Sequence, residues 1–161
     1  MSTFFNKQHL RAMSKFHYIA RVIIREGNQV LLVRATGADN TFLPGGHVEF
    51  GETAVHALQR EVNEEMGHAL EVEIFLGAVE HMWPADTLSN HEINLVFSGK
   101  LPGLDPGEFP ISNEAHLELL WAPINLIDEY NLQPASLVKL IKQENTSPSF
   151  WGSTMEPATE R

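Results

Sequence analysis

The stretch GHVEFGE at Gly46–Glu52, followed after seven residues by REVNEEMGH at Arg60–His68, decides how this chain is interpreted. The second part has helical character, and three glutamates, Glu61, Glu64 and Glu65, fall within five positions of it. Like charges four residues apart destabilise an isolated helix by roughly 0.2–0.5 kcal/mol per pair. A helix that keeps them usually has a cation nearby, and clustered carboxylate oxygens suit hard divalent ions such as Mg²⁺ or Mn²⁺.

The same segment has recognisable helix boundaries and one apolar side. Four apolar residues at helical spacing are expected to pack inward: Ala54, Leu58, Val62 and Met66. The glutamates border this apolar side. Thr53 is the expected N-cap, and Gly67 is the expected stop in the left-handed conformation. Upstream, Gly45 and Gly46 form a tight turn, in which a backbone carbonyl can approach a metal or a phosphate closely.

A run of glutamates on a helix is most often a solvated face, but the spacing here resembles the Nudix box. That box reads Gly, five residues, Glu, seven residues, Arg-Glu-aliphatic-any-Glu-Glu-any-Gly-aliphatic. The matching residues are Gly46, Glu52, Arg60, Glu61, Val62, Glu64, Glu65 and Gly67. The one departure is His68, where the family has an aliphatic residue. The resemblance extends over about 16–144 and implies an α/β fold, the Nudix α/β/α sandwich with a mixed β-sheet between helices.

The resemblance also implies a chemistry, the hydrolysis of a nucleoside diphosphate linked to another group. Water attacks phosphorus, and Mg²⁺ or Mn²⁺ is the expected cofactor that neutralises the phosphate oxygens. The implied metal ligands are the Gly45 carbonyl and the carboxylates of Glu61, Glu64 and Glu65. Arg60 and Glu52 are expected to pair with each other or with neighbouring acids, and so to aim the ligating carboxylates.

The general base differs among Nudix enzymes, some of which use a box glutamate and others a carboxylate on a later loop. Glu114, seven residues before Trp121, is the downstream candidate; the alternative is a plain loop acid. Three further glutamates are weaker candidates for this role, and a surface position is expected for each: Glu80, Glu92 and Glu118.

Four residues are candidates for binding substrate. Arg34 ends a predicted strand that faces the glycine turn, so a phosphate contact is expected there. Phe42 and Trp83 can stack on a base, although core packing is the commoner role of such residues. His47 follows Gly46 directly and is a candidate substrate contact.

The substrate class is less sharply indicated. Pro84 lies sixteen positions beyond the box, and a proline near that distance is similar to the pattern of ADP-ribose and nucleotide-sugar pyrophosphatases. Pro84 therefore favours ADP-ribose or a nucleotide sugar as substrate. The modest length instead suits the MutT-like enzymes that cleave nucleoside triphosphates or oxidised nucleotides. Another class, non-catalytic nucleotide sensors, commonly lacks a box carboxylate or the arginine, and all of these are present here.

Composition limits the partners. The chain has 161 residues, which predicts one core, and a formal net charge of −10, which disfavours a nucleic-acid polymer as partner. It has no cysteine, and its eight histidines lack the spacing of a zinc site. Neither a membrane-spanning run nor a signal peptide is found, so a cytoplasmic location is expected. A homodimer is expected only because Nudix proteins often dimerise.

The chain divides into an N-terminal extension at 1–15, a Nudix hydrolase domain at 16–144 and a flexible tail at 145–161. Within the domain, residues 83–90 read as a loop. The predicted strands cover 16–25, 29–35, 70–82 (bent near Gly77), 91–101 and 117–121, and the predicted second helix covers 134–144.

Overall fold

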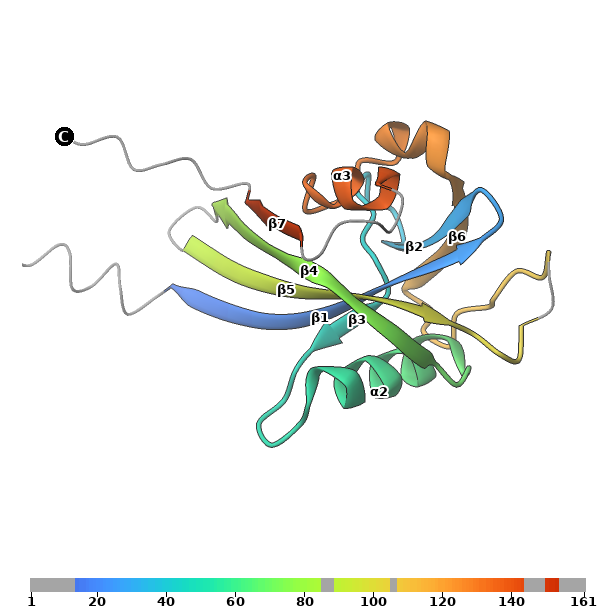
Figure 1. Ribbon diagram of the computed structural model, residues 1–161, viewed down its shortest axis with the longest axis horizontal. Helices are drawn as coiled ribbons and strands as arrows, with labels where there is room; N and C mark the ends of the chain where they lie inside the picture. The colour runs from blue at the N-terminus through green and yellow to red at the C-terminus, as the bar shows by residue number, and fades with distance from the viewer. Residues whose placement is uncertain (1–13, 85–88, 105–106, 144–149, 154–161) are drawn as a thin grey trace, which may run out of the picture.

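The computed structural model describes residues 14–84, 89–104, 107–143 and 150–153. One mixed sheet runs in the order β6-β2-β1-β5-β4-β7, with β3 paired beside β1. The strands are β1 (Lys15–Glu26), β2 (Gln29–Ala35), β3 (Gly45–His47), β4 (Glu71–Pro84), β5 (Ser89–Lys100), β6 (Leu117–Pro123) and β7 (Phe150–Ser153). Helix α2 (Ala54–Met66) covers one face, and the 3-10 helix η1 (Ile124–Tyr130) with α3 (Leu137–Lys142) covers the other (Figure 1). The predicted α/β/α sandwich is confirmed.

Strand β1 is the central element, because it is paired along both of its edges. It runs parallel to β5 and antiparallel to β2 and β3. Its side chains alternate between the two cores: Val22 and Ile24 pack with α2, whereas Ile23 packs with α3 and η1. Each such buried aliphatic side chain contributes roughly 1.5–3 kcal/mol. The run of Val and Ile therefore encodes a strand covered on both faces.

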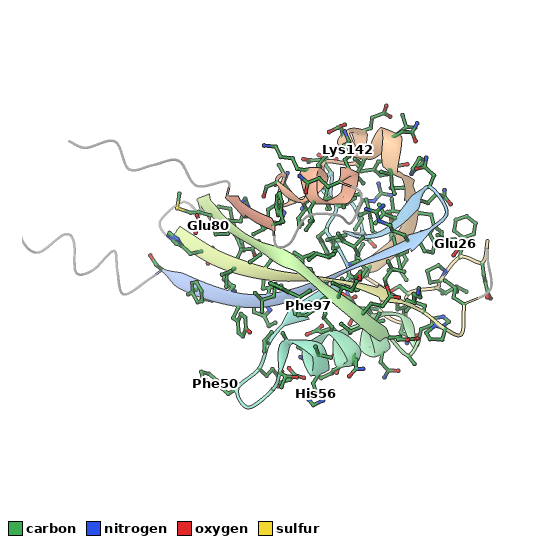
Figure 2. All side chains as sticks on the ribbon, viewed as in Figure 1. Glu26, Phe50, His56, Glu80, Phe97 and Lys142 are labelled. Atoms are coloured by element: carbon green, nitrogen blue, oxygen red, sulfur yellow. The ribbon has the colours of Figure 1, made fainter. Side chains whose placement is uncertain are left out.

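Helix α2 has the predicted boundaries. The Thr53 hydroxyl accepts a hydrogen bond from the His56 amide at 3.2 Å, which caps the first turn. Gly67 ends the helix with φ 68°, and its amide donates to the Asn63 carbonyl at 2.9 Å. His56 points away from the sheet, and Phe50 lies in the loop that leads into the helix (Figure 2). The apolar stripe packs on the sheet as expected.

Several segments differ from the prediction. Strand β4 continues through Trp83 to Pro84, where a loop was expected, because it stays paired with β5 as far as Ser89. The 3-10 helix η1 was not predicted, since its seven residues are too few to show a helical period. The second helix begins at Leu137 and is shorter than predicted. The residues from Pro134 onward form turns with hydrogen bonds between residues i and i+3, such as that from the Leu137 amide to the Pro134 carbonyl.

Residues 150–153 form β7, an edge strand, within a stretch that was predicted to be a flexible tail. They pair in parallel with β4 at Gly77–Glu80. Gly77 makes this approach possible, because a Cβ there would lie 2.1 Å from the Phe150 carbonyl oxygen. The predicted bend near Gly77 is confirmed by two register shifts in β4 just before it. The rest of the predicted tail and the predicted N-terminal extension, apart from residues 14 and 15, lie outside the described residues. Within those residues, the helices are too short or too polar to cross a membrane.

Candidate active site

The site begins at the turn of Gly45 and Gly46, where β3 pairs with β1. Gly45 has φ 119°, and a Cβ there would lie 2.3 Å from the Ala20 carbonyl oxygen. No other residue fits this position without moving the backbone. The Gly45 carbonyl accepts a hydrogen bond at 2.6 Å from Nη1 of Arg21, which also donates to the Leu43 carbonyl at 2.9 Å. A cation on β1 therefore lies directly behind the turn.

Gly46 leaves room for a carboxylate of α2. A Cβ at Gly46 would lie 2.4 Å from Cδ of Glu61 and 2.5 and 2.6 Å from its two oxygens. The absence of a side chain at Gly46 thus lets Glu61 rest against the backbone of the glycine turn. This contact joins the two halves of the box in space.

Arg60 gathers the acids of the box. Its Nε lies 2.9 Å from Oε1 of Glu52 and its Nη2 lies 3.0 Å from Oε2, a two-point ion pair. Its Nη1 donates to Glu61 at 2.9 Å and to Glu64 at 3.3 Å, and Nη2 also donates to the His47 carbonyl at 3.1 Å. The predicted Arg60–Glu52 pair is confirmed. Its bonds to Glu52 and Glu61 raise the pKa of Arg60, and the bond from Arg60 is the main reason that the pKa of Glu52 is lowered.

Glu65 is the buried acid of the site, with 5% of its surface exposed. Its pKa is raised from 4.5 to about 7, chiefly because the carboxylate is buried, and the neighbouring carboxylates of Glu61 and Glu114 contribute to this rise. The Arg21 guanidinium and the Gly45 amide, 3.4 Å from Oε2, act in the opposite direction. A buried carboxylate among other acids gains much from a bound cation.

The loop that carries Glu114 is tied to the end of α2. The Ser112 hydroxyl donates to the Glu65 carbonyl at 3.2 Å, and the Asn113 amide donates to the same oxygen at 2.7 Å. The Ser112 oxygen also accepts from the Glu114 amide at 3.1 Å. Glu114 itself pairs with His116 at 3.2 Å. The structure thus brings the downstream carboxylate to the box, although the two are far apart in sequence.

The donors at this site fit a hard divalent cation. They are oxygens from carboxylates and one backbone carbonyl, which suit Mg²⁺ or Mn²⁺ and not a soft metal. Across the described residues, no three His, Cys, Asp or Glu side chains are grouped closely enough to hold an ion by themselves. Glu61 and Glu64 are both paired with Arg60, and 53% of the Glu64 side chain is exposed.

A cavity of about 580 Å³ opens on the α3 side of the sheet, and Arg21, which the box acids act on, is one of the residues that line it. Phe42 and Trp83, both predicted to stack on a base, line it together with Arg21 and Glu92. The Arg21 guanidinium lies over the Phe42 ring, 5.3 Å from its centroid. Since Glu65 and Glu92 both act on Arg21, this arginine lies between the acid cluster and the cavity.

The other two substrate candidates lie elsewhere. Arg34 makes a two-point pair with Glu118 of β6, at 3.0 and 2.7 Å, and is not among the residues that line the cavity. His47 is exposed and contacts His17, with 2.8 Å between Nε2 of His47 and Nδ1 of His17. The His17 ring in turn stacks on Trp83, with 5.6 Å between centroids.

Sequence reasoning missed Arg21, and it was wrong about Glu92, which is 7% exposed and not a surface residue. In β5 the apolar residues Ile93 and Leu95 are only partly buried, whereas Glu92 and Asn94 lie inside. For Arg21 the available signal was a charged residue among the apolar residues of β1.

The chain is similar to several known proteins. The family model of the NUDIX domain matches residues 15–143. The 8-oxo-dGDP phosphatase NUDT18 of Homo sapiens is 35% identical over 109 residues, which cover 66% of this chain and 31% of that protein. The ADP-ribose pyrophosphatase of Methanocaldococcus jannaschii is 38% identical over 80 residues, 47% of this chain and 45% of that protein. The chain therefore spans less than half the length of these two relatives.

Solved structures share the fold. The MutT protein of Methanosarcina mazei superimposes with a TM-score of 0.62 at 21% identity, over 80% of this chain and 92% of that one. A MutT NUDIX hydrolase from Burkholderia pseudomallei gives a TM-score of 0.58 at 25% identity, over 70% and 86%. With the family model matched over most of its length and the box assembled around Gly46, Arg60 and Glu65, this chain belongs to the Nudix family.

Proposed function

We propose that this protein is a metal-dependent hydrolase of a phosphoanhydride bond in a small nucleotide, a nucleoside diphosphate linked to another group. The observation that carries the proposal is the buried carboxylate of Glu65, which accepts a hydrogen bond from the Gly45 amide and is acted on by the charges of Glu61 and Glu114. Arg21 links this carboxylate to an aromatic cavity, because it acts on Glu65 and also lines the cavity. Family membership supports the same activity.

Each residue of the site has a distinct part in this proposal. Glu61, Glu64, Glu65 and the Gly45 carbonyl would hold Mg²⁺ or Mn²⁺, which supplies positive charge against the phosphate oxygens. Arg60 and Glu52 fix the direction of the α2 carboxylates. Arg21 places a further positive charge between these acids and the cavity. Glu114 is the candidate general base, because its loop is bonded to the Glu65 carbonyl through Ser112.

Two substrate classes are supported by different observations. The sequence favours ADP-ribose or a nucleotide sugar, and the relative from Methanocaldococcus jannaschii is named for ADP-ribose. The human relative is named for 8-oxo-dGDP, which favours an oxidised nucleotide. Both need a pocket for a base next to a diphosphate, and the cavity lined by Phe42 and Trp83 supplies it in the proposal.

The test is hydrolysis of a panel with Mg²⁺: ADP-ribose, UDP-glucose, dGTP, 8-oxo-dGTP, 8-oxo-dGDP and a diadenosine polyphosphate. At least one should be cleaved, and Glu65→Gln should lower the rate about a hundredfold or more, since a buried charge at the reacting centre is removed. Glu73→Gln, on the surface of β4 and paired with Lys100, is the matched control and should keep the rate.

The alternative is a nucleotide sensor without turnover. Tight binding of a panel member in Mg²⁺, with no release of phosphate or nucleoside monophosphate, would favour the sensor and reject the proposed reaction. The complete set of box acids and Arg60 supports catalysis instead.

A further inference from the structure

Glu92 lies in the wall of the cavity without a role in the acid cluster. Its Oε1 accepts a hydrogen bond from Nδ2 of Asn94 at 2.9 Å, and Asn94 is fully buried. The carboxylates that act on Glu65 are those of Glu61 and Glu114, whereas Glu92 acts on Arg21. Glu92 thus lies beyond Arg21 as seen from the acids, on the side where a substrate's nonreacting part would lie.

The surroundings of Glu92 are set by strand register. On β1 its cross-strand partner is His17 and on β4 it is His81, so the carboxylate lies between two imidazole side chains on one face of the sheet. Trp83 stacks on His17 and makes a tilted contact with His81. The rings of Phe42, His81 and Trp83 line the cavity and suit flat groups. Glu92 adds a carboxylate to the same wall.

A buried carboxylate needs hydrogen-bond donors, because desolvation without compensation is costly. An ionised carboxylate accepts about four hydrogen bonds, and Asn94 donates one of them to Glu92. The Nδ2 group of Asn94 also donates to the Val79 carbonyl at 3.5 Å, so the side chain that bonds Glu92 is itself anchored to β4. Because Glu92 lines the cavity, its further acceptor capacity is available to a ligand bound there.

We infer that Glu92 is a specificity-determining residue that binds the Watson–Crick edge of a guanine-type base. This inference rests on the proposed function, because it assumes that the cavity takes the base of a nucleotide substrate. Guanine and 8-oxoguanine present two adjacent donors, N1–H and N2–H, which match the two oxygens of a carboxylate. Adenine presents a donor at N6 next to an acceptor at N1, whose lone pair would oppose the second oxygen.

The rest of the cavity wall is compatible with the same edge. Guanine carries an acceptor at O6, which requires a donor from the protein. Amide side chains of Asn40, Asn131 and Gln133 line the cavity, and Arg21 adds guanidinium N–H groups. Among nucleoside diphosphate derivatives, this cavity would therefore select guanine nucleotides, including oxidised ones and GDP-sugars.

The test compares product binding, which requires no turnover. GMP, 8-oxo-dGMP and AMP are titrated by calorimetry into the full chain and into Glu92→Gln. The wild type should bind the guanine-type nucleotides roughly tenfold to a hundredfold more tightly than AMP, the range expected for one bidentate contact. Glutamine has the same shape but places a donor at one position, so that preference should fall to about one.

Glu73→Gln on the same sheet, outside the cavity, is the matched control and should keep the preference. Equal binding of GMP and AMP by the wild type would overturn the inference. The inference would also be overturned if Glu92→Gln lost the same affinity for GMP and for AMP, because the loss of a purely structural carboxylate would weaken the binding of both bases equally. Thermal unfolding of each variant identifies a failure to fold, in which case Glu92→Asp, which keeps the acceptors, should retain the order of preference.

The two proposals fail separately. Selective binding of GMP without hydrolysis of any guanine nucleotide would reject the proposed reaction and leave the role of Glu92 intact. Hydrolysis that proceeds with equal efficiency on guanine and adenine substrates would reject the role of Glu92 and leave the proposed reaction intact.

Discussion

The guanidinium of Arg60 and the carboxylate of Glu52 face each other in a two-point ion pair, at 2.9 and 3.0 Å, across the loop that precedes α2. The pair has consequences for the whole box, because the third nitrogen of Arg60 holds Glu61 and Glu64. Arginine can bridge three carboxylates in this way since its N–H groups form a planar fork, which lysine lacks.

Arg60→Lys should therefore lower Mn²⁺ affinity and hydrolysis by about tenfold to a hundredfold, as expected when the partners of ligating carboxylates are lost. Mn²⁺ binding followed by electron paramagnetic resonance measures the first effect, and initial rates measure the second. The matched control is Arg25→Lys, where the arginine donates to the Ile141 carbonyl outside the site. Unchanged Mn²⁺ affinity in Arg60→Lys would show that Arg60 does not direct the box acids.

Gly46→Ala should leave the fold intact and weaken metal binding. Gly46 lacks a positive φ, so alanine is acceptable to the backbone, and the new Cβ meets only the Glu61 carboxylate among its nearest neighbours. That carboxylate must move, and we expect Mn²⁺ affinity to fall at least tenfold with little change in melting temperature. Gly103→Ala, where the nearest atom is 4.0 Å away, is the control. A large drop in melting temperature would mean that the contact with Glu61 is structural.

Glu65 should make the metal-free protein less stable as the pH rises. Its pKa is raised from 4.5 to about 7, so between these values the folded state holds a proton that the unfolded state has released. The stabilisation is fully present below about pH 4.5 and is lost as the pH rises through 7. Relative to Glu65→Gln, the wild type should lose roughly 3 kcal/mol of unfolding free energy across this window.

Urea unfolding in EDTA, at pH values from 4.5 to 8, measures that difference for the two proteins. Titration of groups shared by both cancels in the comparison. Mg²⁺ added at pH 8 should then stabilise the wild type more than Glu65→Gln, because ligand binding to the folded state shifts unfolding. A difference that does not change with pH would contradict the raised pKa of Glu65.

Ser112→Ala should slow hydrolysis through the position of Glu114. The hydroxyl bonds both the Glu65 carbonyl and the backbone of Glu114, so its loss frees the loop while the Asn113 amide keeps one bond to α2. We expect a stability loss of about 1 kcal/mol and a larger proportional fall in kcat. Ser98→Ala removes a hydroxyl that accepts from the Ile74 amide and is the control. An unchanged kcat in Ser112→Ala and in Glu114→Gln would remove Glu114 from the mechanism.

Local elements were predictable where a few neighbouring residues determine the structure. The hydroxyl of Thr53 and the flexibility of Gly67 set the ends of α2 by interactions within one turn. The Arg60–Glu52 pair was also predictable, because both residues belong to one short motif. Longer-range features were not: β7 at Phe150–Ser153 is a strand only because β4 offers it a paired edge and Gly77 leaves it room.

The orientation of β5 shows the same limit. A strand with alternating polar and apolar residues has two possible inward faces, and a shift by one residue exchanges them. Here the register with β1 places Glu92 opposite His17 and turns the polar face inward, against the simplest expectation. The pairing of β5 with β1 and β4 decides which face points inward, because the sequence of β5 is compatible with either orientation.

The amino-acid sequence by itself determined the family, the helix with its acids and the glycine turn, because those features depend on spacing within about twenty-three residues. Tertiary structure alone decided that Arg21 stands behind the Gly45 carbonyl, that Glu114 reaches Glu65, and that Glu92 lines the cavity. The physical reason is that these contacts join strands and loops whose relative positions follow from packing two cores on one sheet. Such packing depends on the whole chain at once.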